Sequence, residues 1–307
     1  MIVRSALSLL CLATSATTTV LAQTAASPQI VVTGEEVGSA YGAPPAFSRA
    51  RFAPLTTAYV LPPWAFYSAF IYQGNGFRHG PPDHLFTQEV EVGLPHRFGL
   101  AFENTFERFN GGGGDSSISI EGRYAFADWN KIPLNPTIFA EYKFGVGQIR
   151  HEEGPPPPPG EEEGDGAPKK PDAYEFRLLL SQDFGERVEW AFNAFFEKEN
   201  TGDRGREWGF AQSLATPLIP NERLKVGVEM QYQNFTVKDT RGSPIHRFGV
   251  GPTIAWKPTR GTRFDLSTLF GTTEDSPKVQ VFAVFSMLFG PGGEGNEAEA
   301  PASTRNR

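Results

Sequence analysis

The sequence predicts an all-β protein, a transmembrane antiparallel up-and-down β-barrel of about 12 strands with a periplasmic N-terminal segment. Three observations support this prediction. Apolar and polar residues alternate with a period of two, the chain begins with a secretory-type signal, and short and long connections alternate along it. Alternation alone also suits a soluble β-sandwich, which would bury its apolar face. A sandwich has no reason to sort its connections by length, so we favour the barrel.

The clearest predicted hairpin lies at residues 85–109, where two alternating runs meet at the turn LPHR, residues 94–97. In the second run, Phe98, Phe102 and Phe106 share one face, while Glu103 and Glu107 share the other. Successive side chains of a strand point to opposite faces. One face therefore suits lipid and the other suits water.

Residues 1–22 have the composition of a cleaved signal peptide. Arg4 precedes an apolar core at residues 6–13, and small residues follow up to Ala22. The apolar core is too short to span a bilayer as a helix. Cys11 is the only cysteine in the chain and lies within this segment. We therefore expect a mature chain without disulfides or cysteine-ligated metals.

Residues 23–63 are rich in alanine, proline and other small residues, and we interpret them as a periplasmic N-terminal segment. Within it, residues 29–34 (QIVVTG) resemble the TonB box that opens many TonB-dependent receptors. In those receptors an extended segment pairs with an edge strand of the energising protein. The resemblance implies a TonB-like periplasmic partner, and the alternative is a loosely docked leader.

The barrel is expected to occupy residues 64–289. The predicted strands are residues 64–73, 85–94, 98–109, 117–127, 136–147, 173–184, 187–199, 207–216, 223–237, 245–257, 262–271 and 278–289. Residues 74–84 and 110–116 are predicted loops, the second containing the glycine run 111–114. Residues 148–172 form a Pro/Glu-rich extracellular loop, and residues 290–307 a disordered polar tail. Counting from a periplasmic N-terminus places the tight connections in the periplasm and the long ones outside.

Composition agrees with a protein of the outer membrane. The formal net charge is −7, the mean hydropathy is −0.33, and 26 residues are phenylalanine. A barrel hides its lipid-facing half in every second residue, so its average hydropathy is polar. Membrane lipid and lipopolysaccharide are therefore the expected surroundings, and the acidic balance argues against nucleic acid. Aromatic residues fall near strand ends, as interfacial girdles do: Trp64, Trp190, Trp208, Tyr232 and Trp256.

Two stretches resemble known outer-membrane proteins. Residues 279–289 (VQVFAVFSMLF) are similar to the aromatic-terminated last strand that the barrel-assembly machinery recognises. Residues 64–289, with hairpins such as VEVGLPHRFGLAFE (residues 90–103), resemble the phenol-degradation MetA-type group of porin-like barrels. The resemblance implies an outer-membrane barrel, points towards transport, and carries over no binding residues.

The sequence predicts no catalytic, cofactor-binding or metal-binding site. His246 is the only histidine in a predicted strand, and Ser243 stands at an odd separation from it, on the opposite face. A Ser/His pair of the kind used by outer-membrane lipid-modifying enzymes is therefore not expected. His79, Asp83 and His84 could offer metal ligands, but a Gly/Pro loop does not impose ligand geometry.

The remaining candidate residues are charged side chains that alternation assigns to the lumen. They are Glu89, Glu91, Glu103, Glu121, Arg123, Glu141, Lys143, Glu175, Arg177, Asp183, Glu189, Glu197, Lys225, Glu229, Arg247, Arg263 and Asp265. Isolated buried charges are costly, so these residues must pair or stay hydrated. A fully paired set would fill the interior, whereas an acidic surplus would leave a path that favours cations.

Three functions follow from these expectations. The first is a passive channel for small polar or cationic solutes. The second is a structural or receptor-type barrel that engages a periplasmic partner through residues 23–63. The third, an outer-membrane lipid-modifying enzyme, is the least supported, and the chain is expected not to be an enzyme. The choice between the first two depends on whether the N-terminal segment enters the pore.

Overall fold

The computed structural model describes residues 60–109, 112–147, 169–185, 188–219, 223–259 and 261–290. The predicted signal peptide, the TonB-box-like hexamer, most of the Pro/Glu-rich loop and residues 291–307 lie outside the described residues. The helices of the described part are the short 3-10 turns η2 (Pro95–Arg97) and η3 (Lys238–Thr240). Neither has the length or hydropathy of a membrane-spanning helix.

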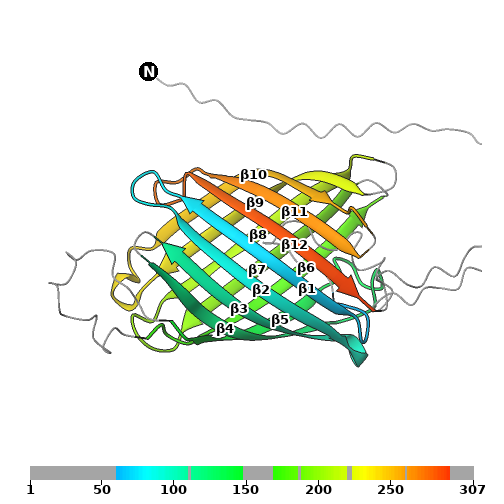
Figure 1. The fold of residues 1–307 in the computed structure, drawn as a ribbon, viewed down its shortest axis with the longest axis horizontal. Coiled ribbons are helices and arrows are strands. Elements are labelled where there is room, and N and C mark those ends of the chain that lie inside the picture. The colour runs from blue at the N-terminus through cyan, green and yellow to red at the C-terminus, as the bar shows by residue number, and fades with distance from the viewer. Residues whose placement is uncertain are drawn as a thin grey trace, which may run out of the picture. The chain divides into compact units, whose positions relative to one another are not determined.

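The described part of the chain forms a closed barrel of antiparallel strands, in which each strand pairs with its neighbours in sequence (Figure 1). The strands are β1 (Phe66–Gly76), β2 (Asp83–Leu94), β3 (Phe98–Phe109), β4 (Gly112–Ala125), β5 (Thr137–Gly145), β6 (Ala173–Phe184), β7 (Val188–Glu199), β8 (Arg206–Pro217), β9 (Leu224–Thr236), β10 (Ile245–Trp256), β11 (Thr262–Gly271) and β12 (Val279–Phe289). The barrel closes where β1 pairs with β12, from Phe66 opposite Phe289 to Gly76 opposite Val279. The predicted fold class and strand number are confirmed.

Two predicted loops are shorter than expected. β4 begins at Gly112, so most of the predicted glycine loop belongs to a strand. A Cβ on Gly113 would lie 2.8 Å from the Glu107 carbonyl oxygen of β3, and the register shifts nearby between Thr105 and Phe106. Glycine here permits close backbone approach beside a bulge. The loop prediction was wrong because a glycine run was taken as a break.

The β1–β2 hairpin also extends further than predicted. β2 begins at Asp83, whose Oδ1 accepts a hydrogen bond from Asn75 Nδ2 at 2.6 Å. His84 therefore lies in a strand, and the prediction that His246 is the only strand histidine was wrong. The proline pair before Asp83 obscured this strand start in the sequence.

The alternation of faces is present throughout the barrel wall. On β3, Phe98 and Phe102 are each 48% exposed, whereas Ala101 between them is fully buried. Exposed phenylalanines recur on the same face of the other strands, and buried glutamates lie on the opposite face. A closed sheet has no unpaired edge, so its backbone polar groups are satisfied within the wall. The wall thus presents an apolar exterior around a charged lumen.

A charge placed on the outer face should destabilise the barrel strongly. We expect Phe102→Arg to lower the free energy of unfolding by about 2–4 kcal/mol, because the charge would enter hydrocarbon. Thr105→Arg is the matched control, since Thr105 lies on the same strand and lines the acidic lumen. Urea titration of folding into vesicles measures both variants. An equal loss for the two variants would contradict this assignment of faces.

The two ends of the barrel differ. We call the end with the connections at 95–97, 126–136 and 218–223 the turn end, and the opposite end the loop end. Residues 60–62, which we call the N-terminal strap, enter the lumen at the turn end. Leu61 is fully buried there in a cluster with Tyr67, Ala69, Val284 and Leu288. Trp64 N donates to the Gly93 carbonyl at 2.7 Å, which fixes the chain as it enters β1.

Candidate functional site in the barrel lumen

The half of the lumen near the loop end contains a cavity of about 480 Å³. Among the described residues, its charged lining comprises eight carboxyl groups and three cationic groups. The carboxyl groups belong to Glu89, Glu103, Glu107, Glu121, Glu141, Glu175, Glu197 and Glu207, and the cationic groups to Arg123, Lys143 and Arg177. The wall therefore carries an acidic surplus where the cavity meets the loop end.

Five of these glutamates form a continuous row, which we call the glutamate ladder. Glu121 lies directly opposite Glu141, and Glu141 lies opposite Glu175 on the next strand. Glu175 in turn lies opposite Glu197, and Glu197 opposite Glu207. Like charges placed directly opposite one another destabilise a sheet. Sheet stability therefore does not explain this row.

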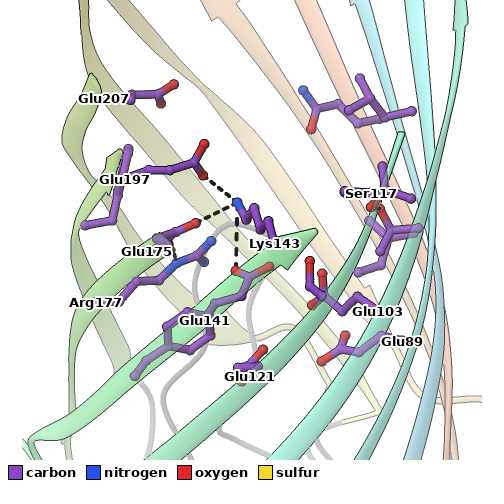
Figure 2. A pocket seen from close by; sticks show the side chains of 18 of the residues that line it. Glu89, Glu103, Ser117, Glu121, Glu141, Lys143, Glu175, Arg177, Glu197 and Glu207 are labelled. Atoms are coloured by element: carbon purple, nitrogen blue, oxygen red, sulfur yellow. Dashed lines mark hydrogen bonds and ion pairs between the residues drawn. The ribbon is translucent and has the colours of Figure 1, made fainter. Parts of the chain in front are cut away.

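The ladder rises from the middle of the barrel to the rim at the loop end. Glu121 stands well inside β4, whereas Glu207 is the second residue of β8, next to the loop. Register partners lie perpendicular to the strands, and strands in a barrel are tilted, so a row of partners climbs the wall. Figure 2 shows Glu207, Glu197 and Glu175 one below the other on this wall. The ladder thus connects the rim with the depth of the cavity.

Three cations neutralise part of the ladder. Lys143 Nζ lies 2.9 Å from Glu175 Oε2, 2.5 Å from Glu197 Oε2 and 3.8 Å from Glu141 Oε2 (Figure 2). Arg177 also pairs with Glu175. Below them, Arg123 pairs with Glu121 and lies 3.5 Å from Glu89 and 3.3 Å from Glu91. The cations are outnumbered even though Lys143 and Arg123 each contact three carboxylates, so the surplus of acid remains.

The surplus is concentrated at Glu103 and Glu207. Neither has an ion pair within 4 Å among the described residues, and Glu207 only accepts a hydrogen bond from Gln233 Nε2 at 2.8 Å. Glu103 lies opposite Glu89, and carboxylate oxygens of Glu89, Glu103 and Glu121 lie within 4.8 Å of one another. Such oxygen-only groups are of the kind that hard cations prefer. A cation entering the cavity would relieve the repulsion among these carboxylates.

Three phenylalanines, Phe139, Phe195 and Phe282, also line the cavity. The guanidinium carbons of Arg123 and Arg177 lie 5.6 and 4.8 Å from the centroid of the Phe139 ring. Phe195 also lines the cavity, facing inward as its odd position on β7 requires. Cation–π contact with Phe139 helps to hold both arginines at the floor of the cavity. The floor is therefore a layer of fixed side chains.

Below this floor, the turn-end half of the lumen is filled by paired charges and small residues. Lys225 Nζ lies 2.6 Å from Glu189 Oε1, and Arg263 makes a two-point contact with Asp265 at 2.8–3.0 Å. The side chains of Arg263 and Asp265 are almost completely buried. Paired charges therefore fill the turn-end half of the lumen, and an acidic surplus lines the loop-end half.

The N-terminal strap packs against glycines of the wall at the turn end. A Cβ on Gly93 would lie 1.9 Å from the Pro62 carbonyl oxygen, so only glycine leaves room for the strap at this position. A Cβ on Gly99 would lie 3.4 Å from Val60 Cγ1. Val60 and Leu61 are 3% and 0% exposed. The strap is thus packed inside the lumen and does not lie on its outer rim.

The lumenal residues predicted from sequence fall into three groups. Those lining the cavity are Glu89, Glu103, Glu121, Arg123, Glu141, Lys143, Glu175, Arg177 and Glu197. Those on the inward face nearer the turn end are Glu91, Asp183, Glu189, Lys225, Glu229, Arg263 and Asp265. Arg247, on β10, instead borders a separate small space that residues of β9, β11 and β12 also line.

Sequence reasoning missed Glu107 and Glu207 as cavity residues. Glu107 is an even number of residues from Glu103 on β3 and therefore shares its inward face. Glu207 shares the inward face of β8 with Ala211 in the same way. This signal was present in the sequence. What the sequence did not show is that five glutamates on separate strands share one row.

The histidines form no constellation with serine in the described part of the chain. His246 Nδ1 lies 2.8 Å from the Tyr232 hydroxyl and 3.3 Å from Asn234 Nδ2. His84 Nδ1 lies 2.9 Å from the Tyr72 hydroxyl, and Asp83 binds Asn75. Among the described residues, the acidic and histidine side chains grouped closely enough to hold a metal are Glu89, Glu103 and Glu121, not His79, Asp83 and His84.

The closed antiparallel wall, its apolar exterior and its charged lumen define an outer-membrane β-barrel. Among solved structures, the chain is similar to an outer-membrane channel from Pseudomonas putida F1. The identity is 11%, the TM-score is 0.52, and the match covers 76% of this chain and 98% of that one.

Two porins match the chain less well. NanC is 9% identical with a TM-score of 0.45, covering 73% of this chain and 99% of its own. KdgM is 8% identical with a TM-score of 0.41, covering 74% and 98%. No protein-family model and no curated protein matches the sequence. At these identities the likeness concerns the fold, and the MetA-type and TonB-box resemblances stay predictions.

Proposed function

We propose that this barrel is a channel for small cationic solutes whose turn end is closed by the N-terminal strap at rest. Solutes would enter at the loop end, follow the glutamate ladder into the cavity, and leave when the strap withdraws. The observation that carries this proposal is the ladder itself, five directly opposed glutamates within a lumen whose carboxylates outnumber its cations. Rings of carboxylates favour cations in channels.

The position of the ladder supports a transport role over a purely structural one. A set of charges that only filled the barrel would be paired throughout, as Lys225 and Glu189 are in the turn-end half. In the loop-end half, Glu103 and Glu207 face the cavity without an ion pair among the described residues. Low-dielectric walls lined by one sign of charge concentrate ions of the opposite sign. The cavity would therefore enrich cations before they meet the floor.

Conductance and reversal potential in planar bilayers test this proposal. We expect the chain without residues 23–62 to form stable cation-selective steps, and the chain from residue 23 onward to conduct far less. Adding Glu103→Gln and Glu207→Gln to the shortened chain should lower its cation-to-anion permeability ratio roughly two- to fivefold at 0.1 M salt, and less at 1 M, where charges are screened.

The matched control replaces Glu274→Gln and Asp275→Asn, which removes two exposed acidic charges from the β11–β12 loop. This variant should leave the permeability ratio nearly unchanged. No conductance from either form of the chain would refute the channel. Conductance that prefers anions, or a permeability ratio insensitive to Glu103 and Glu207, would refute the role of the acidic surplus in the cavity.

One observation favours a second function. The strap fills the turn end so tightly that Leu61 is fully buried, which suits a receptor-type or structural barrel as well as a resting channel. In that case a periplasmic partner would act on residues 23–63, and the cavity would bind its ligand without passing it. If the full chain binds a small cation but the chain without residues 23–62 shows no conductance, this alternative is favoured.

A further inference from the structure

The outer face of the barrel carries a pair of directly opposed carboxamides on β2 and β3, in the middle of its apolar belt. Gln88 on β2 lies directly opposite Asn104 on β3, and both side chains are exposed. Gln88 is the sixth of twelve residues in β2, and Asn104 is the seventh of twelve in β3. The pair therefore lies at mid-height on the lipid-facing side of the wall. We call it the amide pair.

Exposed apolar side chains surround the amide pair on every side. Towards the loop end lie Phe86 and Phe106, which are opposite each other, and towards the turn end lie Val90 and Phe102. The lateral neighbours are Phe70, opposite Gln88, and Ile118, opposite Asn104. Their exposed fractions are Phe70 50%, Phe86 44%, Val90 50%, Phe102 48%, Phe106 38% and Ile118 47%. The amide pair is thus a polar island within a lipid-facing patch.

Lipid alone cannot satisfy the hydrogen-bond donors and acceptors of the amide pair. Each carboxamide offers two N–H donors and an acceptor oxygen. Hydrocarbon provides no hydrogen-bond partner, and the ester and head groups of lipids lie at the membrane surfaces, away from mid-height. Neither Gln88 nor Asn104 makes a side-chain hydrogen bond to another described residue. Even a bond between the two would leave N–H groups facing the acyl chains, which is costly.

We propose that the amide pair is the centre of a contact with a second copy of this chain. A two-fold axis along the membrane normal would bring Gln88 against Asn104 of the partner subunit, and Asn104 against the partner subunit's Gln88. Carboxamides suit such a contact because each is both donor and acceptor, so a patch can bind its own copy. Amide side chains join membrane-spanning segments in this way. The surrounding phenylalanines would pack as the apolar rim of the interface.

Cysteine cross-linking in vesicles tests this proposal. Because Cys11 is the only cysteine, a chain beginning at residue 23 has none, and Gln88→Cys introduces a single thiol. Val228→Cys is the matched control, since Val228 is 51% exposed on the outer face of β9, five strands from β2 by the shorter way around the barrel. With a bifunctional thiol cross-linker long enough to reach from Gln88→Cys to the same position of the partner subunit, at a low protein-to-lipid ratio, we expect Gln88→Cys to give mainly covalent dimer and Val228→Cys only a background level. Equal cross-linking at the two positions would overturn the proposal.

A second variant tests the amides without a cross-link. Gln88→Leu with Asn104→Leu makes the patch uniformly apolar and should leave barrel folding intact, as judged by heat-modifiable gel mobility. We expect light scattering in mild detergent to give a protein mass of two chains for the unaltered barrel and of one chain for the double variant. A single-chain mass for both, with background cross-linking at Gln88→Cys, would mean that lipid alone covers the amide pair. An unchanged mass of two chains in the double variant would place the interface elsewhere.

Discussion

Replacing Gly93 with valine should open the turn end of the barrel, turning an almost silent protein into one with long-lived conductance steps. Any Cβ at this position would lie 1.9 Å from the Pro62 carbonyl oxygen and 2.6 Å from that of Leu61. These are backbone atoms, so they cannot move aside as a flexible side chain would. The N-terminal strap must therefore leave its place, and Leu61 must leave the cluster that contains Tyr67 and Leu288.

The control for this result is Gly122→Val. Gly122 lies on β4, and a Cβ there would meet nothing within 4 Å, so the same substitution should leave the strap and the conductance unchanged. Leu61→Asp provides a second route to the open state, because it removes the apolar anchor without altering any strand. Single-channel recording in planar bilayers compares the three variants. Silence from both Gly93→Val and Leu61→Asp, in barrels that fold normally, would mean that the strap is not what closes the turn end.

The second large effect is expected at Arg263. Arg263 and Asp265 contact each other through two nitrogens at 2.8–3.0 Å, and their side chains are 2% and 1% exposed. Arg263→Met would leave the Asp265 carboxylate buried without this partner. Breaking one side of a buried pair typically costs about 3–5 kcal/mol. We expect the free energy of unfolding to fall by this amount, measured by urea titration of the barrel in vesicles.

Two comparisons show whether the loss of stability in Arg263→Met comes from the lost charge pair or from the lost packing of the arginine side chain. Replacing both members, Arg263→Met with Asp265→Leu, removes the stranded carboxylate and should restore most of the lost stability, because apolar substitutes for a buried pair are often neutral. Arg97 lies 3.6 Å from Asp128 in a solvent-exposed pair at the turn end. Arg97→Met should change the stability little, since exposed pairs contribute little. Equal losses for the single and double variants would show that the packing of the arginine matters more than its charge.

These two predictions concern the turn-end half of the lumen, whereas solute selection is proposed for the loop-end half. The division follows from the way charges are distributed along the strands. Near the turn end, Lys225 and Arg263 each have an acidic neighbour within 3 Å. Near the loop end, Lys143 is shared among Glu141, Glu175 and Glu197. Stability and selectivity should therefore respond to different substitutions within one barrel.

Much of the architecture could be predicted from local pattern. The alternation of Phe98, Phe102 and Phe106 with Glu103 and Glu107 separated the two faces of β3, because successive side chains of a strand point to opposite faces, and the barrel prediction assigned the phenylalanine face to the outside. Repeating this rule along the chain predicted the strand number, the closed fold and which charges are directed inward. Errors arose where glycine and proline were taken as breaks, at Gly112 and before Asp83.

The sequence by itself determined the fold class, the lipid-facing side of each strand and the acidic excess of the lumen, because these depend only on residue type and a period of two. The glutamate ladder was decided by the tertiary structure, since Glu121 and Glu207 share a row only through the register of β4 to β8. The packing of the N-terminal strap at the turn end was decided in the same way. Residues 60–62 show no strand or turn pattern of their own. Their burial depends on the space that Gly93 and Gly99 leave once the barrel has closed around them.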